Sequence, residues 1–555
     1  MLASRHGRLL LSRRTTTAVG SLQLQLQSFN LNTRSSSTTT TTTVAAAKPN
    51  PKPKQPVPVP SGSYPFVGHL PRLISGGESV QNWEMLHQEC GEIFEINVMG
   101  KEIVVTNNPK HAKVILMHQG SYPYRTPQKS WATIFEQQKW PAGIAWATGD
   151  DWKRKRAVLG ETLLMQKHAK QYVPHVIPAA NRMVDCLTGH LNSEGRLTES
   201  VRLLSGMFAL EAVMKVVVGG DFQALTVPLP PDAVQFQQAV ETMFTETSVV
   251  ESIPLHITFK TARYQRLTQA WKTMYSFPQQ TLQPILDHYN EHGKLPDQVH
   301  GTVLPKLMER HEEGELTLDE VLGIGVQAIA GAVDTTGQTT EYLFYNLAAH
   351  FDVQERIVQQ LAETTGGTTD EPLQLTVEEY SNQKYLFAVL KESMRLTPTI
   401  GAHARTLVQD ADLGDFVIPK GKLVLMNYLS MTQNPDHYPS PHLFLPERFL
   451  KDKTETAACP MQHHHSSEIV ADEKQAAIRA GHAVSKDPYA AIPFGHGARK
   501  CVGKAFAELD IHLLALAVLR KYRIEYDGPP LEQREQNLLR PSVPLWPHFR
   551  FVPRE

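Results

Sequence analysis

The sequence predicts a mainly α-helical fold with a smaller β region. Most of the chain carries apolar residues at spacings of three and four, the period of a helix that packs one face on a core. Only two stretches gather apolar and β-branched residues around a turn, as strands do. No period of about 20–50 residues recurs, which excludes repeat architectures.

Composition limits the class of protein. The chain has 555 residues, of which 41% are apolar, so a large core can form. The 55 Lys and Arg residues balance the 56 Asp and Glu residues, which gives no case for nucleic acid as a partner. The four cysteines are too sparse for a disulfide framework and favour a reducing compartment; they are Cys90, Cys186, Cys459 and Cys501.

The N-terminal region differs from the rest. The residues before Glu78 include nine Arg or Lys and no acid, and Ser and Thr are frequent. This composition is typical of an organellar transit peptide, which we assign to residues 1–48. The early Arg/Leu segment favours the mitochondrion, with the plastid and a simple disordered tail as alternatives. A stiff proline-rich linker follows over residues 49–60. No stretch reaches the roughly 18 apolar residues of a membrane-spanning helix, so no anchor is expected.

Two strand groups and a basic helix come next. Residues 92–106 predict a hairpin that turns at Gly100-Lys101, and residues 416–425 predict a second strand group around Pro419-Lys420-Gly421. Between the two groups, Trp152 and Arg156 are four residues apart and therefore share a helix face. The intervening Lys153, Arg154 and Lys155 are expected to face solvent or a partner. A wholly solvated basic face is the alternative interpretation.

A long helix is predicted from Thr317 to about His350. Thr317 followed by Glu320 is a capping-box pattern. The middle of this helix reads Ala-Gly-Ala-Val-Asp-Thr-Thr over residues 330–336. Small residues leave a groove beside a helix, whereas Asp334 and Thr335 are unfavourable there because they compete for backbone hydrogen bonds. A solvent-facing turn would explain the two polar residues, and so would a function in the groove.

The C-terminal third contains a charged helix, an insertion and a cysteine loop. Glu392 and Arg395 lie three residues apart on one helical face, which by itself is often surface decoration. Residues 452–488 are polar and predict a surface insertion; its run 463–465 of histidines with Cys459 fits no strong metal template. In the segment 494–503, glycines flank a basic pair and Cys501, and a helical pattern follows. Free N–H groups at a helix start favour a thiolate, although a lone cysteine is more often structural.

The order Phe-Gly-x-Gly-x-Arg-x-Cys-x-Gly in this segment resembles the haem-binding loop of the cytochrome P450 family. The other motifs described above occur in that family's order, and the resemblance extends from about Pro60 to the C-terminus. It implies one large domain over residues 61–555 that binds haem b, with Cys501 as the thiolate ligand of the iron.

The resemblance also implies residue roles. Asp334 and Thr335 would deliver protons to oxygen, and Glu392, Arg395 and Arg448 would form a buried structural network. The cofactor-binding residues that it implies, two of them in the cysteine loop and three for the haem propionates, are Phe494, Arg499, Trp152, Arg156 and Arg405.

Local stretches look like the mitochondrial, ferredoxin-dependent branch of the family, among them Tyr122-Pro123-x-Arg125. Lys391 and Lys504 match cations with which that branch docks its ferredoxin, whereas Phe387 stands where the branch has another lysine. No cysteine cluster for an iron–sulfur centre is present. The resemblance therefore implies electrons from a separate ferredoxin with its NADPH-dependent reductase.

The expected activity is insertion of one oxygen atom from O2 into a C–H bond of an apolar small molecule, such as a sterol or steroid. The expected location is the matrix side of the mitochondrial inner membrane, with peripheral membrane contact. Two alternatives are a haem-thiolate isomerase or dehydratase that acts on a peroxide, and a haem-binding sensor without turnover. Neither alternative needs the pair Asp334-Thr335, which favours the monooxygenase.

Overall fold

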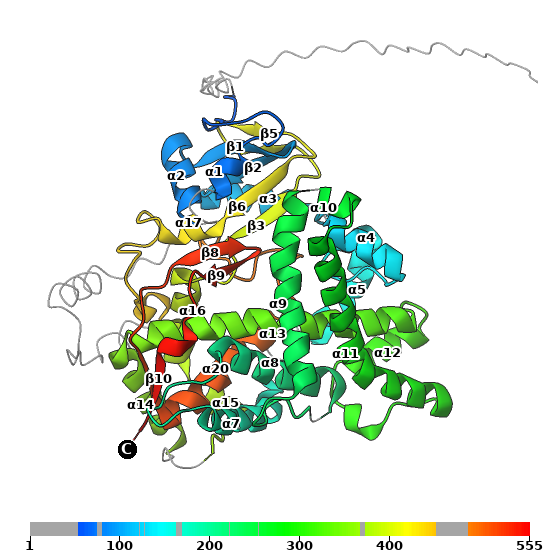
Figure 1. Cartoon of the computed structure of the whole chain (residues 1–555), viewed down its shortest axis with the longest axis vertical. Helices are drawn as coiled ribbons and strands as arrows, with labels where there is room; N and C mark the ends of the chain where they lie inside the picture. Colours follow the sequence, from blue (N-terminus) through cyan, green and yellow to red (C-terminus); the bar gives the residue numbers. More distant parts are fainter. Residues whose placement is uncertain are drawn as a thin grey trace, which may run out of the picture. The chain divides into compact units, whose positions relative to one another are not determined.

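A computed structural model describes residues 54–74, 80–120, 122–126, 128–162, 169–220, 222–253, 255–366, 372–450 and 487–554. The predicted transit peptide, and the predicted insertion up to residue 486 with its histidines and Cys459, lie outside the described residues. Within the described part, helices predominate over a small β portion (Figure 1), and the predicted fold class is confirmed.

The α-helices are α1 (Leu70–Ile74), α2 (Gln81–Cys90), α3 (Pro109–Met117), α4 (Lys129–Gln138), α5 (Gly149–Thr162), α7 (Val173–Gly189), α8 (Val201–Val218), α9 (Pro231–Ser252), α10 (Leu255–Thr258), α11 (Ala262–His292), α12 (Leu304–Glu312), α13 (Leu318–Ala348), α14 (Phe351–Thr365), α15 (Val377–Ser381), α16 (Lys384–Leu396), α17 (Tyr428–Gln433) and α20 (Lys504–Lys521). Short 3-10 helices are η1 (Asp297–Val299), η2 (Pro446–Phe449) and η3 (Trp546–His548). The strands are β1 (Ile93–Val98), β2 (Lys101–Thr106), β3 (Ala402–Thr406), β4 (Ala411–Asp412), β5 (Val417–Ile418), β6 (Leu423–Asn427), β7 (Tyr522–Tyr526), β8 (Gln533–Gln536), β9 (Leu538–Pro541) and β10 (Phe549–Pro553).

The main sheet has the order β1-β2-β6-β3. The predicted hairpin is confirmed, since β1 and β2 pair antiparallel with Val98 opposite Lys101. The second strand group is present as the strands β5 and β6, which do not pair with each other. β5 pairs with β4 in a separate small sheet, whereas β6 pairs parallel with β2 and antiparallel with β3. Because β6 is an inner strand with both edges paired, it has no edge left for β5.

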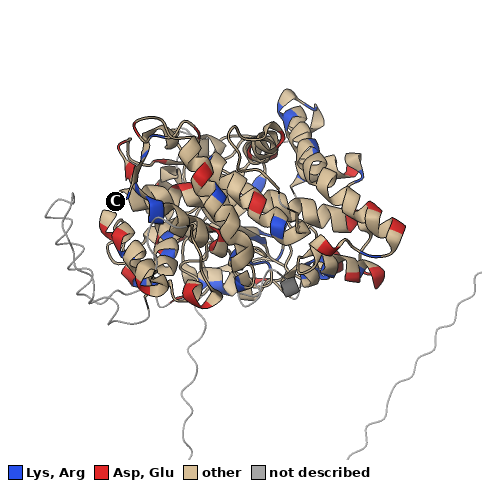
Figure 2. Cartoon of the chain, turned by 90° about the horizontal axis from the view of Figure 1, so that it is seen from below, with Lys and Arg blue, Asp and Glu red and all other residues tan. Residues whose placement is uncertain are grey.

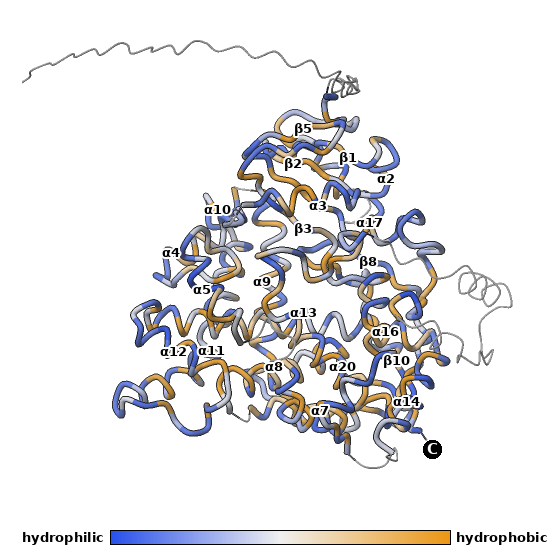
Figure 3. Tube along the Cα trace, turned by 180° about the vertical axis from the view of Figure 1, so that it is seen from behind, coloured by the Kyte–Doolittle hydropathy of each residue, from blue (hydrophilic) through white to orange (hydrophobic). Residues whose placement is uncertain are grey.

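Helix α13 is the central element (Figure 1), and α8, α9, α11 and α20 pack against it. Its predicted capping box is present, with the Thr317 side chain accepting from the Glu320 N–H. Figure 3 shows hydrophobic stretches along α7, α8 and α20, and nearly every residue of α8 is buried. These helices form the core on which α13 lies.

Charged residues hold particular elements together. Both signs are interspersed on the helices seen in Figure 2, in keeping with the near-zero net charge. The predicted network on α16 is confirmed: Arg395 donates to both oxygens of Glu392 at 2.8 Å, and Arg448 of η2 lies 3.3 Å from the same carboxylate. All three side chains are buried, so the network joins two elements that are far apart in sequence.

The solvent-facing prediction for residues 153–155 was right only for Lys153, which is exposed. Lys155 is buried and contacts Asp151 at 2.8 Å and Glu320 of α13 at 3.2 Å. Arg154 is half-buried and donates to the same Glu320 at 2.6 Å. The basic run therefore ties α5 to the start of α13, because Glu320 supplies the charge that a buried lysine needs.

Candidate active site

The segment 494–503 folds as a tight loop just before α20. Gly495 and Gly497 have φ of +70° and +77°, the left-handed region that favours glycine. A Cβ atom at Gly497 would also lie 2.3 Å from Gln119 Nε2. The Cys501 N–H donates to the Phe494 carbonyl at 2.8 Å, and the Lys500 N–H donates to Gly497 at 3.1 Å. These bonds fix the position of the Cys501 thiol.

Cys501 is accessible and yet surrounded by protein. Its side chain is exposed, while burial raises the pKa of the thiol, opposed by the Gly503 N–H and the Arg156 charge. A side chain that is both accessible and desolvated faces an internal cavity. The N–H group expected at the helix start is therefore present, but burial has the larger effect on the pKa of the Cys501 thiol.

Basic side chains gather around this loop. Arg156 of α5 donates from Nη2 to the Lys500 carbonyl at 2.6 Å. Arg499 donates to the Pro123 and Ala147 carbonyls at 2.7 and 2.6 Å. Its guanidinium lies 4.5 Å from the centre of the Trp152 ring. The structure thus brings Trp152, Arg156 and Arg499 together, as the predicted site requires.

Arg405 joins this cluster from β3. It is buried, and Nε donates to Gln119 Oε1 at 3.1 Å. Burial, with Arg125 and Arg499 nearby, lowers the pKa of Arg405 to about 10. Burial, with Arg125 and Arg156, likewise lowers the pKa of Arg499 to about 10. Buried guanidinium groups whose pKa is lowered further by neighbouring arginines favour the binding of anions.

One atom of this cluster lacks a partner. Nη1 of Arg499 is buried and has no hydrogen bond within the described part of the chain. A buried, charged donor without a partner is costly, so such an atom calls for a bound acceptor. The two propionates of a haem are acceptors of the right charge. The arginine cluster and the accessible Cys501 therefore fit a haem.

Sequence reasoning missed two members of the cluster. Arg125 belongs to the segment Tyr122-Pro123-x-Arg125 and was not among the predicted site residues, yet its charge is among the causes that lower the pKa of Arg405 and Arg499. Gln119 contacts both Arg405 and the glycine loop. No local pattern marks Gln119, because its partners are distant in sequence.

Asp334 and Thr335 lie on α13, and their side chains have different surroundings. The Thr335 hydroxyl donates to the Gly331 carbonyl at 2.8 Å. A Cβ atom at Gly331 would meet nothing within 4 Å, so the expected open space beside α13 exists. Asp334 is fully buried and accepts from Arg202 of α8 at 2.9 Å and from Arg540 of β9. The two residues contact α8, β9 and α13 itself rather than the cysteine loop.

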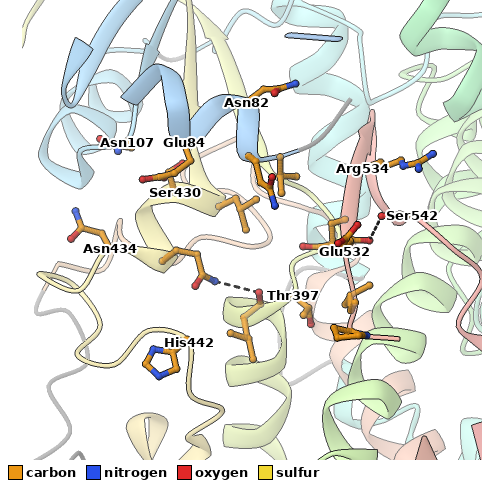
Figure 4. Close-up of a pocket in the computed structure, with 18 of the residues that line it drawn as sticks. Asn82, Glu84, Asn107, Thr397, Ser430, Asn434, His442, Glu532, Arg534 and Ser542 are labelled. Carbon is orange, nitrogen blue, oxygen red and sulfur yellow. Dashed lines mark hydrogen bonds between the residues drawn. The ribbon is translucent and has the colours of Figure 1, made fainter. Parts of the chain in front are cut away.

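A separate cleft of about 1120 Å³ lies between α2, the end of α16 and the segment around β8 (Figure 4). It is lined by polar side chains such as Asn82, Thr397 and Glu532. The predicted site residues do not line it, so this cleft is distinct from the site around Cys501.

The cations expected to dock a ferredoxin are exposed. Lys504 begins α20 with its side chain 49% exposed and 3.8 Å from Glu508. Lys391 is exposed on α16. With Lys170, Phe387 and His512 it lines a small pocket of about 70 Å³. Lys170 thus supplies a further cation beside Phe387, where the branch pattern would have placed a lysine.

The chain is similar in sequence to a known protein family and to several known proteins. The model of the family described as Cytochrome P450 matches residues 57–547. The mitochondrial 1,25-dihydroxyvitamin D(3) 24-hydroxylase of Mus musculus is 24% identical over 89% of this chain and 88% of its own length. The mitochondrial 25-hydroxyvitamin D-1 alpha hydroxylase of Homo sapiens is 25% identical over 78% and 80%. The mitochondrial sterol 26-hydroxylase of Oryctolagus cuniculus is 24% identical over 74% and 72%.

Proposed function

We propose, because the chain belongs to the cytochrome P450 family of haem-thiolate monooxygenases, that it binds haem b through Cys501 and hydroxylates an apolar substrate. In this reaction O2, two electrons and two protons convert a C–H bond to C–OH, and the second oxygen atom leaves as water. The observation that carries the proposal is the arginine cluster beside Cys501, with the unpartnered Arg499 Nη1. Carboxylates of a haem would satisfy that donor.

Each side chain has a role in this proposal. Cys501 would ligate the iron, and a bound haem-thiolate supplies the activation of oxygen. Trp152, Arg156, Arg405 and Arg499 would bind and orient the propionates, and Phe494 would hold the loop in place through its carbonyl, which accepts the Cys501 N–H. A charge-assisted bond of this kind contributes roughly 1.5–3 kcal/mol.

Proton delivery would use Asp334 and Thr335. The Thr335 hydroxyl now donates to Gly331, beside the open space along α13, so a rotation of that hydroxyl would present its proton to a ligand there. Asp334 is held by two arginines. To pass protons to Thr335, the Asp334 carboxylate would have to release one of these arginines and bind a water molecule in its place.

The substrate and the electron donor are proposed from the relatives. The names of the relatives given above include a sterol and two vitamin D compounds as substrates. We therefore propose a sterol, steroid or vitamin-D-like substrate. These relatives are mitochondrial by name, which supports the mitochondrion rather than the plastid, and residues 1–48 as its transit peptide. We propose a ferredoxin with its NADPH-dependent reductase as donor, docked near Lys391 and Lys504.

Peripheral contact with the matrix side of the inner membrane is also proposed. Phe66 is 95% exposed and Phe259 is 72% exposed, and Ile74 and Leu255 are exposed as well. Isolated exposed apolar residues are common, but large ones at this degree of exposure are suited to an interface. None of the helices that the structure describes has the length and apolar character to cross a bilayer, so the contact would be peripheral.

The first test is spectroscopic. The purified protein is reduced with dithionite, carbon monoxide is added, and the difference spectrum is recorded. We expect the red-shifted Soret band of a thiolate-ligated haem, absent in Cys501→Ala. A wild-type spectrum without that band would refute haem-thiolate ligation.

The second test is reconstitution. NADPH, a ferredoxin reductase and a ferredoxin should support oxygen-dependent product formation from a panel of sterols. Conversion of a hydroperoxide without any electron donor would instead favour an isomerase.

A further inference from the structure

A stripe of three polar residues follows one face of α13 away from its small-residue segment. Asp334, Gln338 and Glu341 are spaced by four and three residues, so they share this face. Their exposed fractions are 0%, 0% and 3%. Burial of polar side chains is costly unless hydrogen bonds or opposite charges compensate it, so the partners of these three residues matter.

The contacts form one continuous chain. Arg540 of β9 donates from one nitrogen to Asp334 and from Nη1 to Gln338 Oε1 at 2.8 Å. Gln338 Nε2 donates onward to Glu341 Oε2 at 3.1 Å. The Gln338 amide therefore links the arginine that holds Asp334 to the second acid, Glu341. A change of charge on Glu341 is felt at Arg540 through one side chain.

The charges of this cluster do not balance if every acid is ionised. Arg202 of α8 lies 2.9 Å from Asp334 and 2.7 Å from Glu241 of α9. Two arginines therefore match Asp334 and Glu241, and Glu341 is a third acid whose direct partner is a neutral amide. The other titratable groups near it, Tyr342 of α13 and Tyr526 of β7, bring no positive charge. Burial raises the pKa of Glu341 to about 7, although Arg202, Gln338 and Arg540 oppose it.

We propose that Glu341 is a positioning residue that holds a proton and, by gaining or losing it, sets how tightly Arg540 and Arg202 hold Asp334. With Glu341 neutral, Arg540 and Arg202 compensate two carboxylates, Asp334 and Glu241. With Glu341 ionised, the same two arginines are shared with a third carboxylate, and Asp334 is held less tightly. The link to turnover rests on the proposed role of Asp334 in proton delivery; the protonation of Glu341 does not.

The protonation is tested on stability. The haem-loaded enzyme is unfolded with urea at a series of pH values, for wild type, Glu341→Gln and Glu341→Met. A folded pKa raised from 4.5 to about 7 means that stability is greatest below the unfolded pKa and falls as pH rises through the folded one. We expect the folding constant of wild type to fall on the order of 10²-fold more than that of either variant. Glu378→Gln, at an exposed position on α15, should behave as wild type.

Infrared spectroscopy gives an independent readout. The wild-type enzyme should show a protonated carboxyl band that disappears as pH rises through about 7, and both variants should lack that band. A variant that keeps the wild-type pH dependence and the band would overturn the proposal. Failure of both neutral variants to fold would also overturn it, since a neutral glutamic acid should tolerate a neutral replacement of similar size.

The link to Asp334 is tested on coupling. The ratio of hydrogen peroxide to hydroxylated product is measured across the same pH range. In wild type the ratio should fall as Glu341 ionises and Asp334 is held less tightly, whereas in Glu341→Gln it should stay at the low-pH value. Suppose that the stability of Glu341→Gln no longer depends on pH as that of wild type does, while its peroxide-to-product ratio keeps the wild-type pH profile. Glu341 then does not act on Asp334. If wild type forms no product at all, the proposed function fails while the stability result still decides the protonation of Glu341.

Discussion

Arg125 is the residue whose importance the structure reveals most clearly. It contributes to the depressed pKa of both Arg405 and Arg499, and it is accessible while its own pKa is lowered by burial. It therefore faces the same interior space as Cys501, whose charge would act on it. A cation in that position is suited to bind a carboxylate of the haem.

Arg125→Gln should weaken haem retention. Loss of one charge-assisted bond costs roughly 1.5–3 kcal/mol, which corresponds to about a tenfold or greater loss of affinity. The measurement is transfer of haem to an excess of an apo haem-binding protein, followed by absorbance. Lys153→Gln, which removes an exposed cation from α5, should leave the transfer rate unchanged. Equal transfer rates for the two variants would exclude Arg125 from the haem site.

Thr335→Ala should separate haem binding from oxygen chemistry. The hydroxyl donates to the Gly331 carbonyl of its own helix, so the fold and the carbon monoxide spectrum should persist. If Thr335 delivers protons, product formation should fall by about 10²-fold or more while NADPH consumption continues as peroxide release. Tight coupling in this variant would refute the proton-delivery role.

The predictability of single residues depended on the distance to their partners. Helical spacing was enough to place Trp152 and Arg156 on one face of α5, since that relation is local. The two arginines that hold Asp334 lie 132 and 206 residues away in sequence, and no local pattern indicates them. The burial of Lys155 was missed for the same reason, because Glu320 belongs to another helix.

At the scale of elements, the Glu392 network joins α16 to η2. Arg395 is fully buried and Arg448 nearly so, so removal of the acid would leave two buried guanidinium groups with reduced compensation. Glu392→Gln should lower the free energy of unfolding by roughly 3–5 kcal/mol. Urea unfolding followed by circular dichroism measures this, with the exposed Glu378→Gln as the matched control. A loss below about 1 kcal/mol would mean that the network contributes little to stability.

The link between α5 and α13 should depend on pH. Hydrogen bonding to Arg154 is the main cause that lowers the pKa of Glu320 from 4.5 to about 2. The Glu320 side chain is only 13% exposed. The stabilisation is therefore complete above pH 4.5 and is lost as pH falls toward 2. Glu320→Gln should cost about 2–3 kcal/mol at neutral pH and almost nothing at the acid end. A cost that does not change with pH would contradict this assignment.

Elements were predicted well where the pattern was long or a cap was present. The capping box at Thr317 marked the start of α13 correctly, and the hairpin of β1 and β2 followed from adjacent strands. The pairing of β6 was not predictable, because its partners β2 and β3 come from distant parts of the chain. Local sequence specifies a strand but leaves its neighbours open.

On the scale of the whole molecule, the fold class and family followed from the sequence because several different motifs occur in the family's order over most of the chain. The cationic character of the cofactor site did not follow from any one motif. It arises because loop, helix and strand segments converge, so that burial, together with the charges of Arg125, Arg156 and Arg499, lowers the pKa of Arg405 or of Arg499. Convergence of this kind is a property of the packed chain.

Electron transfer is the remaining property of the whole molecule. If an acidic ferredoxin docks near Cys501, Lys504→Glu should raise the KM for ferredoxin by about tenfold or more and leave kcat nearly unchanged, because a reversed charge repels the partner without altering the site. The wild-type KM should also rise with salt, since exposed charges are screened over about 8–10 Å. The dithionite-reduced carbon monoxide spectrum should be unchanged, which separates docking from haem binding. Lys294→Glu, an exposed charge in the loop after α11, is the matched control. Equal KM values for the two variants would place the donor elsewhere on the molecule.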